Sequence, residues 1–205
     1  MGGPSRPMTP LTSPLLVLTD RAETRGRPLV EVLGAAVEGG ARVVVLREKD
    51  LPRPARAELA AELAPVLHAV DGLLLAASTP VPGVDGVHLA AADVVPSARP
   101  SLMGRSCHGS AELARAAREG CDYATLSPIF PSVTKPGYGP VLGVAALRGA
   151  PLPVFALGGV DRSNARRCLD AGATGVAVLG AVMRSPDPAA TVRAFRHSLG
   201  VGVAT

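Results

Sequence analysis

The sequence predicts a single α/β domain, a (β/α)8 TIM barrel, and three observations carry this prediction. Short apolar runs recur along the 205 residues, and most are continuous rather than alternating in polarity, as expected for parallel strands buried on both faces. Helix-like segments separate many of these runs, in the order strand then helix. The length lies at the short end of the range for this barrel.

Eight apolar runs are predicted as strands. They are residues 15–18, 43–46, 73–76, 87–89, 102–107, 123–126, 154–157 and 176–179. Helices are predicted over 29–38, 55–67, 110–119, 164–171 and 188–199. Only residues 78–85 separate the third run from the fourth, and this connection is too short for a full helix.

Several helix ends carry local signals. Ser110 is a candidate N-cap, and Gly120 follows the last residue of the same helix, where a left-handed residue ends it. Asp187 and Pro188 open the last helix in a similar way, with proline in the first turn, where its missing amide is harmless. These signals set the element boundaries to within a few residues.

A doubly wound open sheet is the competing fold. Its dinucleotide-binding members carry a glycine-rich turn after the first strand. Asp20, Arg21, Ala22, Glu23 and Thr24 occupy that turn here, which favours the closed barrel. The expected organisation is a flexible N-terminal leader over 1–14, the barrel over 15–200 and a C-terminal tail over 201–205.

Composition excludes several classes of function. The net charge is only +4, aromatic residues make up 2% of the chain and tryptophan is absent, so we expect no nucleic-acid partner. No run approaches the roughly 20 apolar residues that cross a bilayer, so no membrane partner is expected. The three cysteines are odd in number and far apart, which indicates a reduced, cytoplasmic protein.

The active site of such a barrel lies at the carboxyl ends of the strands. Two places there favour phosphate binding: Gly158 and Gly159 after the seventh strand, and Leu179 and Gly180 after the eighth. Glycine lets the backbone approach phosphate oxygens closely. The alternative interpretation is that these glycines only form tight turns.

Charged and titratable residues follow other strands. Arg47 and Lys49 lie two apart after the second strand and share one face of an extended segment, where they could bind a diphosphate or a carboxylate; the alternative is a solvated charge run. His108 follows the fifth strand and could transfer a proton near neutral pH. The other histidines, His68, His88 and His197, are interpreted as structural.

Residues 127–140 form the longest connection without periodicity. Long connections in compact domains are usually functional. Ser132, Thr134 and Lys135 could close over an anionic ligand as a lid. The alternative is a surface loop stiffened by proline and glycine.

From Leu15 to Leu199 the chain resembles the thiamine phosphate synthase and thiazole tautomerase superfamily. The resemblance is carried by an ordered set of segments: 46–50, 85–89 with Asp93, 106–108, 122–123, 127–135, 156–160 and 171–178. The family is a (β/α)8 barrel, in agreement with the pattern of elements. Members of this family often form pairs, so a homodimer is possible.

The resemblance implies a thiazole phosphate ligand whose phosphate binds at Gly158, Gly159, Leu179 and Gly180. In the synthase branch, Arg47, Lys49, Ser132, Thr134 and Lys135 match residues that hold the diphosphate of hydroxymethylpyrimidine diphosphate. Asp93 matches one of two aspartates that serve Mg²⁺. The synthase supplies its second metal carboxylate from an Asn-Asp pair after the third strand, where this chain has Ala76-Ala77-Ser78.

That loss favours the tautomerase branch, which needs no metal cofactor. By resemblance, a histidine at the position of His108 moves a proton there and aromatises a carboxythiazole phosphate. The leading prediction is therefore a thiazole tautomerase with His108 as catalytic residue. The alternatives are a Mg²⁺-dependent thiamine phosphate synthase and a non-catalytic protein that keeps only the phosphate site.

Overall fold

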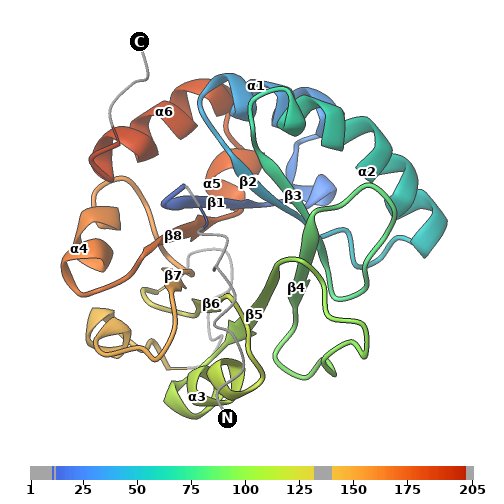
Figure 1. The fold of residues 1–205 in the computed structure, drawn as a ribbon. Coiled ribbons are helices and arrows are strands. Elements are labelled where there is room, and N and C mark those ends of the chain that lie inside the picture. Colours follow the sequence, from blue (N-terminus) through green and yellow to red (C-terminus); the bar gives the residue numbers. More distant parts are fainter. Residues whose placement is uncertain (1–10, 12, 132–139, 202–205) are drawn as a thin grey trace.

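The structure is a closed barrel of parallel strands in sequential order, β1-β2-β3-β4-β5-β6-β7-β8 (Figure 1). This computed structural model describes residues 11, 13–131 and 140–201. β1 pairs with both β2 and β8, so that the sheet has no free edge. The predicted (β/α)8 barrel is confirmed.

Each predicted strand is present, with its ends shifted by at most one residue. The strands are β1 (Leu15–Leu18), β2 (Val43–Leu46), β3 (Leu73–Ala77), β4 (Gly86–Leu89), β5 (Met103–Cys107), β6 (Tyr123–Leu126), β7 (Val154–Ala156) and β8 (Gly175–Val178). Both faces of these strands are buried, which explains their continuous apolar character.

The five predicted helices are also present. They are α1 (Leu29–Glu38), α2 (Arg53–His68), α3 (Ser110–Arg118), α4 (Ala165–Asp170) and α6 (Pro188–Ser198). Three short elements were not predicted: α5 (Gly180–Met183) and the 3-10 turns η1 (Arg21–Glu23) and η2 (Val144–Leu147). Each spans four residues or fewer, too short to show a helical period.

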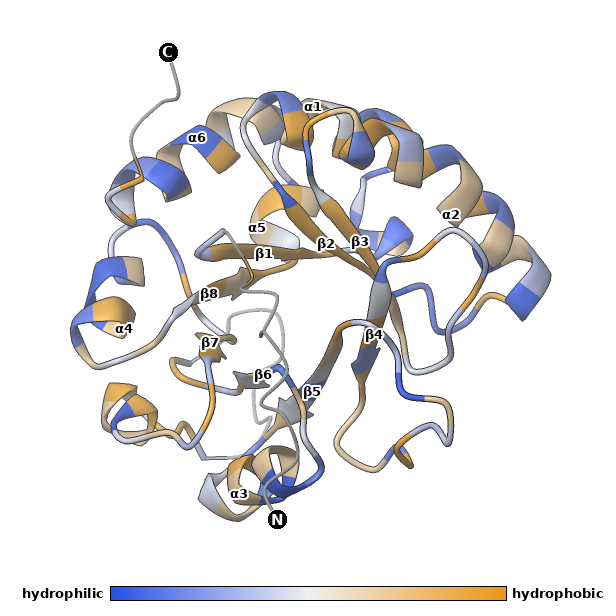
Figure 2. Ribbon diagram, in the orientation of Figure 1, coloured by the Kyte–Doolittle hydropathy of each residue, from blue (hydrophilic) through white to orange (hydrophobic). Residues whose placement is uncertain are grey.

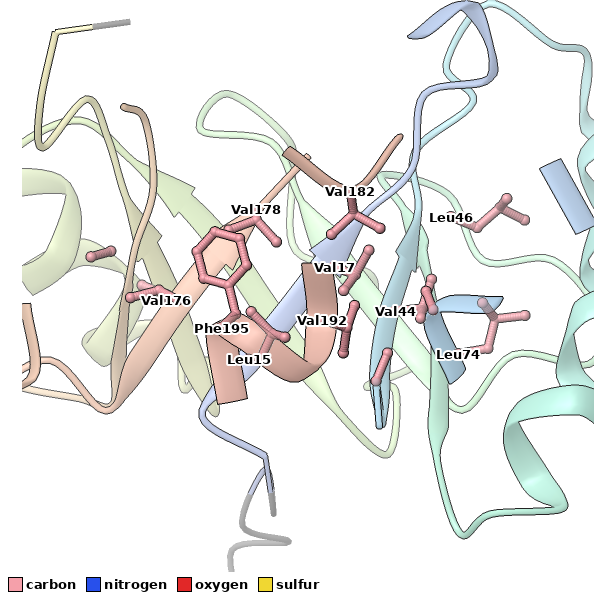
Figure 3. Packing of buried hydrophobic residues seen from close by; sticks show 14 of the residues in the cluster. Leu15, Val17, Val44, Leu46, Leu74, Val176, Val178, Val182, Val192 and Phe195 are labelled. Atoms are coloured by element: carbon pink, nitrogen blue, oxygen red, sulfur yellow. The ribbon is translucent and has the colours of Figure 1, made fainter. Parts of the chain in front are cut away.

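Side chains alternate between two buried layers. The outward residues of each strand pack under the helices, as Figure 3 shows for Val176 and Val178 of β8 beside Val192 and Phe195 of α6. The inward residues fill the barrel and include Leu16, Leu18, Val43, Val45, Leu75, Ala77, Tyr123, Phe155 and Ala177. The strands β1–β3 are strongly apolar, whereas β4 and β5 carry polar residues (Figure 2).

Helical cover is uneven around the barrel. α1, α2 and α6 form a continuous arc outside β1, β2 and β3 (Figure 1). Residues 78–85 and 90–102, all of which the structure describes, connect β3 to β4 and β4 to β5 without a helix. The short connection after β3 was predicted; the second was not singled out.

The N-cap of α3 differs from the prediction. Gly109, not Ser110, is the N-cap residue, and Ser110 is the first helical residue. The carboxylate of Glu112 instead accepts a hydrogen bond of 2.7 Å from the backbone amide of His108. The prediction for α6 is confirmed, because the Asp187 side chain accepts from the amide of Ala190.

Residues at the two ends of the barrel domain also pack on it. Ser13 is buried, its hydroxyl bonds within the segment leading into β1, and the carbonyl of Pro14 accepts from the amide of Val176. These residues belonged to the predicted leader; residues 1–10 and 12 lie outside the described part. At the other end, the amide of Val201 donates to the carbonyl of Arg196.

Two further expectations can be compared with the structure. Cys107, Cys121 and Cys168 are free and buried. Within the described residues, no helix has the length and apolar character needed to cross a membrane.

Candidate active site

A cluster of charged side chains lies at the barrel mouth after β2 and β4. Arg47 and Lys49 follow β2, and Asp93 follows β4. Their charges interact: burial and the neighbouring charge of Arg47 lower the pKa of Lys49, while Asp93 acts to raise it. The structure therefore brings together three of the residues that the sequence predicted for this site.

Two like charges at one place are costly unless an anion is bound. Arg47 has one anionic neighbour, Asp20, whose Oδ2 lies 3.5 Å from its guanidinium. Lys49 has Asp93 close enough to affect its pKa. Counted together, the two cations are balanced by the two carboxylates Asp20 and Asp93. The guanidinium of Arg47 and the ammonium of Lys49 remain the groups here that could contact an anionic ligand.

The segment 47–50 is held from below by a network that the sequence analysis did not predict. Glu48 is buried, and its carboxylate accepts from the hydroxyl of Thr19 at 2.6 Å and from the backbone amide of Arg21 at 3.1 Å. The guanidinium of Arg21 also pairs with Asp50. The alternating charges are therefore not a solvated run: Glu48 and Asp50 anchor the segment, leaving Arg47 and Lys49 for the mouth.

Asp93 is held in a tight turn. Its Oδ2 accepts a hydrogen bond of 2.6 Å from the amide of Ala90, and its own amide donates to the carbonyl of Ala90. Burial raises the pKa of Asp93, but hydrogen bonds from Ala90 and Ser78 and the charges of Lys49 and Arg105 outweigh it, so the pKa lies below its ordinary value. Asp93 is a carboxylate at neutral pH.

The end of β3 adds no second carboxylate. Ala77 points into the barrel with the inward residues, and Ala76 points outward. Ser78 follows in a left-handed conformation with φ of 63° and bonds to Asp93. The described residues contain no group of three or more histidine, cysteine or carboxylate side chains placed to hold a metal ion.

His108 lies at the rim of the mouth, directly after β5, and is exposed, as predicted. Its Nδ1 lies 3.0 Å from the carbonyl oxygen of Ser127. A carbonyl only accepts, so the tautomer that carries its proton on Nδ1 satisfies this contact; the hydroxyl of Ser127 lies 3.3 Å from the same nitrogen. In the neutral ring, Nε2 then carries the lone pair and is the nitrogen that could accept a proton.

His88 lies inside the barrel, as the structural interpretation predicted. Its two ring nitrogens contact the hydroxyls of Tyr123 at 2.9 Å and Ser106 at 3.0 Å. Burial and the charges of Lys49 and Arg105 lower its pKa to about 3, so the ring is neutral at physiological pH.

The predicted phosphate glycines have a second, structural role. Gly158 and Gly159 adopt φ of 87° and 66°. A Cβ on Gly159 would lie 2.4 Å from the carbonyl oxygen of Pro131, and one on Gly158 would lie 2.9 Å from Cα of Pro128. Both the conformation and the packing of Gly159 therefore require glycine, so a side chain at this position should harm the fold as well as any phosphate site.

Leu179 and Gly180 lie after β8, as predicted, but as the N-cap and first residue of α5 rather than as a loop. The first amides of a helix have no intrahelical acceptor. The segment thus places the amides of Gly180 and Ala181 at the carboxyl end of β8, while the amides of the next residues bond within α5. The predicted lid residues Ser132, Thr134 and Lys135 lie outside the described residues.

Comparison with known proteins identifies the family. Residues 15–182 match the family model of thiamine monophosphate synthase. The chain is 37% identical over 197 residues to a putative thiamine-phosphate synthase of Geobacter sulfurreducens, covering 88% of this chain and 92% of the relative. It is also 37% identical over 207 residues to the thiamine-phosphate synthase of Methanoculleus marisnigri, covering 93% and 97% of the two chains.

Solved structures agree. The thiamine phosphate pyrophosphorylase of Pyrococcus furiosus superposes with a TM-score of 0.80 at 30% identity, covering 91% of this chain and 95% of that one. A thiamine phosphate pyrophosphorylase of Bacteroides thetaiotaomicron, at 18% identity and a TM-score of 0.68, shares the fold. The chain belongs to the thiamine monophosphate synthase family and is an enzyme of thiamine biosynthesis.

Proposed function

We propose that this enzyme is a thiamine phosphate synthase, a transferase that joins hydroxymethylpyrimidine diphosphate to a thiazole phosphate. In this reaction the bond between the pyrimidine methylene carbon and the diphosphate oxygen breaks, and the thiazole ring nitrogen forms a new bond to that carbon. The products are thiamine phosphate and diphosphate. This proposal reverses the order of the two enzymes that the sequence analysis considered, because the relatives named above are synthases.

The observation that supports the proposal is that two separate groups of candidate anion donors lie at one mouth. Arg47 and Lys49 follow β2 and face Asp93 after β4. The backbone donors of Gly159 and Gly180 follow β7 and β8. A synthase must hold a diphosphate and a phosphate at the same time, and the two sites match these two groups.

The residues present fit Mg²⁺ in one particular way. Proteins commonly hold this ion through one or two carboxylates together with substrate phosphates and water. Asp93 is ionised at the mouth, beside two cations that would contact the same diphosphate. Asp93 would hold the ion, and the bound ion would neutralise charge on the departing diphosphate.

The remaining steps fall to the chain itself. Arg47 and Lys49 bind and orient the diphosphate, and their charges oppose the negative charge that grows on it as the carbon–oxygen bond breaks. The network of Glu48, Thr19 and Arg21 keeps both cations in place. The glycine backbone positions the thiazole phosphate so that the ring nitrogen can approach the methylene carbon.

Thiazole tautomerase is the second candidate, and two observations favour it. The mouth has the methyl group of Ala77 where a second metal carboxylate is expected. The imidazole of His108 stands at the rim, with Nδ1 bonded so that Nε2 could move a proton. Such a proton transfer needs no metal.

Paired assays of the purified enzyme test the proposal. One assay measures thiamine phosphate formed from the two synthase substrates with and without Mg²⁺; the other measures aromatisation of a carboxythiazole phosphate. We expect Mg²⁺-dependent synthase turnover. Aromatisation without any synthase turnover would overturn the proposal in favour of the tautomerase.

Two variants assign the residues in the same assays. Asp93→Asn should lower synthase activity by about 10²-fold and raise the Mg²⁺ requirement, while His108→Asn should be mild. A loss of about 10²–10⁴-fold in His108→Asn with little change in substrate binding is the expected signature of a general acid or base. That result in the aromatisation assay would support the tautomerase.

A further inference from the structure

Arg105 is a buried cation that the proposed reaction does not use. It belongs to β5, where its register partner is Leu89 of β4. It points outward with Met103 and Cys107, which pack in the outer layer, and only 1% of the residue is exposed. A fully buried arginine is rare unless its guanidinium is satisfied by specific partners.

The partners of Arg105 lie mainly in one turn. Its Nη1 donates to the carbonyl oxygens of Ala90 at 2.9 Å, Ala91 at 3.1 Å and Asp93 at 2.9 Å. Its Nη2 lies 2.8 Å from Oε2 of Glu119, an ion pair whose alignment is not that of a hydrogen bond. One side chain thus gathers three carbonyls of residues 90–93 and ties them to the C-terminal end of α3.

The contacts of Arg105 support a connection that lacks the usual helix. The connection 90–102 between β4 and β5 contains no helix, although the structure describes all of it. In a regular (β/α) unit, the helix after a strand fixes the loop that carries the site residue. Here the turn of residues 90–93 leads into an irregular segment whose Val94 is 85% exposed, so it needs another support.

The turn and the carboxylate of Asp93 form one unit. The amide of Asp93 donates to the carbonyl of Ala90, and the amide of Ala90 donates to Oδ2 of Asp93. Arg105 binds the carbonyls of both residues. Without Arg105, the carbonyls of Ala90 and Asp93 would both lose a hydrogen bond, and the turn that orients the Asp93 carboxylate towards the mouth would be less restrained.

We propose that Arg105 is a positioning residue for Asp93: it holds the turn 90–93 from the outer side of the barrel, in place of the missing helix, and so tunes Mg²⁺ binding with the diphosphate. The link to Mg²⁺ rests on the proposed function. The link between Arg105 and the turn rests on the contacts alone. Partners that orient metal ligands typically change metal affinity by about 10–100-fold when removed.

Three variants of the 205-residue chain test this proposal. Arg105→Met keeps the bulk and removes all donors, and Arg105→Lys keeps the charge but cannot reach three carbonyls and Glu119 together. Arg115→Met is the matched control. Arg115 pairs with the same Glu119 at 2.7 Å, but it is exposed and forms no hydrogen bond with the described turn of residues 90–93.

The first readout is hydrogen exchange at the amides of Ala90 and Asp93, followed by NMR and referenced to exchange in β1 and β2. The second is the Mg²⁺ concentration that gives half-maximal binding of inorganic pyrophosphate, measured by calorimetry. We expect Arg105→Met to speed exchange at the two amides by at least about tenfold and to raise the Mg²⁺ midpoint by about 10–100-fold. Arg105→Lys should lie between, and Arg115→Met should match the wild type.

The outcomes separate this inference from the proposed function. Unchanged exchange at both amides, or faster exchange with an unchanged Mg²⁺ midpoint, would overturn the positioning role. If Arg105→Met does not fold, Arg105→Lys decides in the same way. An enzyme without synthase turnover that still shows both effects would defeat the proposed function and leave the positioning role supported.

Discussion

The two proposed anion sites at the barrel mouth are built differently. The site after β2 and β4 consists of side chains, Arg47, Lys49 and Asp93, mounted on a network of buried polar contacts. The site after β7 and β8 consists of backbone at Gly158, Gly159 and Gly180. A side-chain site can lose a member while the fold remains, whereas a backbone site uses the same atoms for binding and for folding.

This difference has a consequence for mutational analysis. At the end of β3, the small residue Ala77 is the last residue of a regular, buried strand. The fold therefore does not need a carboxylate at this position of the side-chain site. Gly159 does not have this freedom, because the carbonyls of Phe130 and Pro131 occupy the space that a Cβ would need. Substitutions in the side-chain site should therefore change activity, and substitutions at Gly158 and Gly159 in the backbone site should change stability.

The largest expected effect is on the charged side. Lys49→Ala should lower kcat/KM for thiamine phosphate formation by about 10²–10³-fold, since it removes a cation that opposes charge growing on the leaving diphosphate. The midpoint of urea unfolding should hardly move, because Lys49 is exposed as a whole residue and only part of its side chain is desolvated beside Arg47. Arg166→Ala, which removes an exposed pair with Asp170 on α4, is the control and should leave both quantities unchanged. A large loss of stability in Lys49→Ala would contradict the division between the two sites.

The glycine side should respond in the opposite way. Gly159→Ala should lower the free energy of unfolding by about 2–4 kcal/mol, from the left-handed conformation together with the overlap on neighbouring backbone. Gly26→Ala is the matched control: its φ is 80°, but a Cβ there meets nothing within 4 Å, so it should cost only about 1 kcal/mol. The difference between the two losses of unfolding free energy, measured with urea, gives the cost of the overlap between a Cβ at position 159 and the neighbouring backbone. Equal costs would show that the conformation alone requires glycine.

The same distinction explains what the sequence could predict. The strands were predictable because burial on both faces makes each run continuously apolar, and the charged residues after β2 and β4 were recognisable by residue type. The roles of Glu48 and Arg105 were not, since each depends on contacts with segments far along the chain. The position of Gly159 after β7 was predicted correctly. Its packing against Phe130 and Pro131 was not predicted, because it depends on the loop after β6. Ser110 is not the cap because the helix begins one residue earlier than a cap at this position requires, so that Ser110 is already helical and Gly109 is the N-cap residue.

A third prediction concerns the neutral histidine beneath the charged side. The pKa of His88 is about 3 in the folded enzyme, against about 6.5 in an unfolded chain. Between these values the unfolded state binds the extra proton, so stability is complete above pH 6.5 and falls as the pH decreases towards 3. From pH 6.5 to 5 the wild type should lose about 1–2 kcal/mol more than His88→Gln. Denaturant unfolding at both pH values measures this, and equal losses would mean that His88 takes up a proton in the folded state.

The smallest expected change in stability is at Gly180, which differs from Gly158 and Gly159 in its conformation and in the atoms around it. The atoms nearest to a Cβ on Gly180 would be those of the Arg184 guanidinium, and Gly180 is not among the glycines with positive φ. The guanidinium, which pairs with Glu23, is the mobile end of a long side chain and can move aside. Alanine is also favoured over glycine in a helix by about 1 kcal/mol, and Gly180 begins α5. Gly180→Ala should therefore change the free energy of unfolding by less than about 1 kcal/mol.

If the backbone at Gly180 also binds the thiazole phosphate, the same variant should raise the KM for that substrate while the KM for the pyrimidine diphosphate stays constant. A stable variant with both KM values unchanged would confine the phosphate site to Gly158 and Gly159.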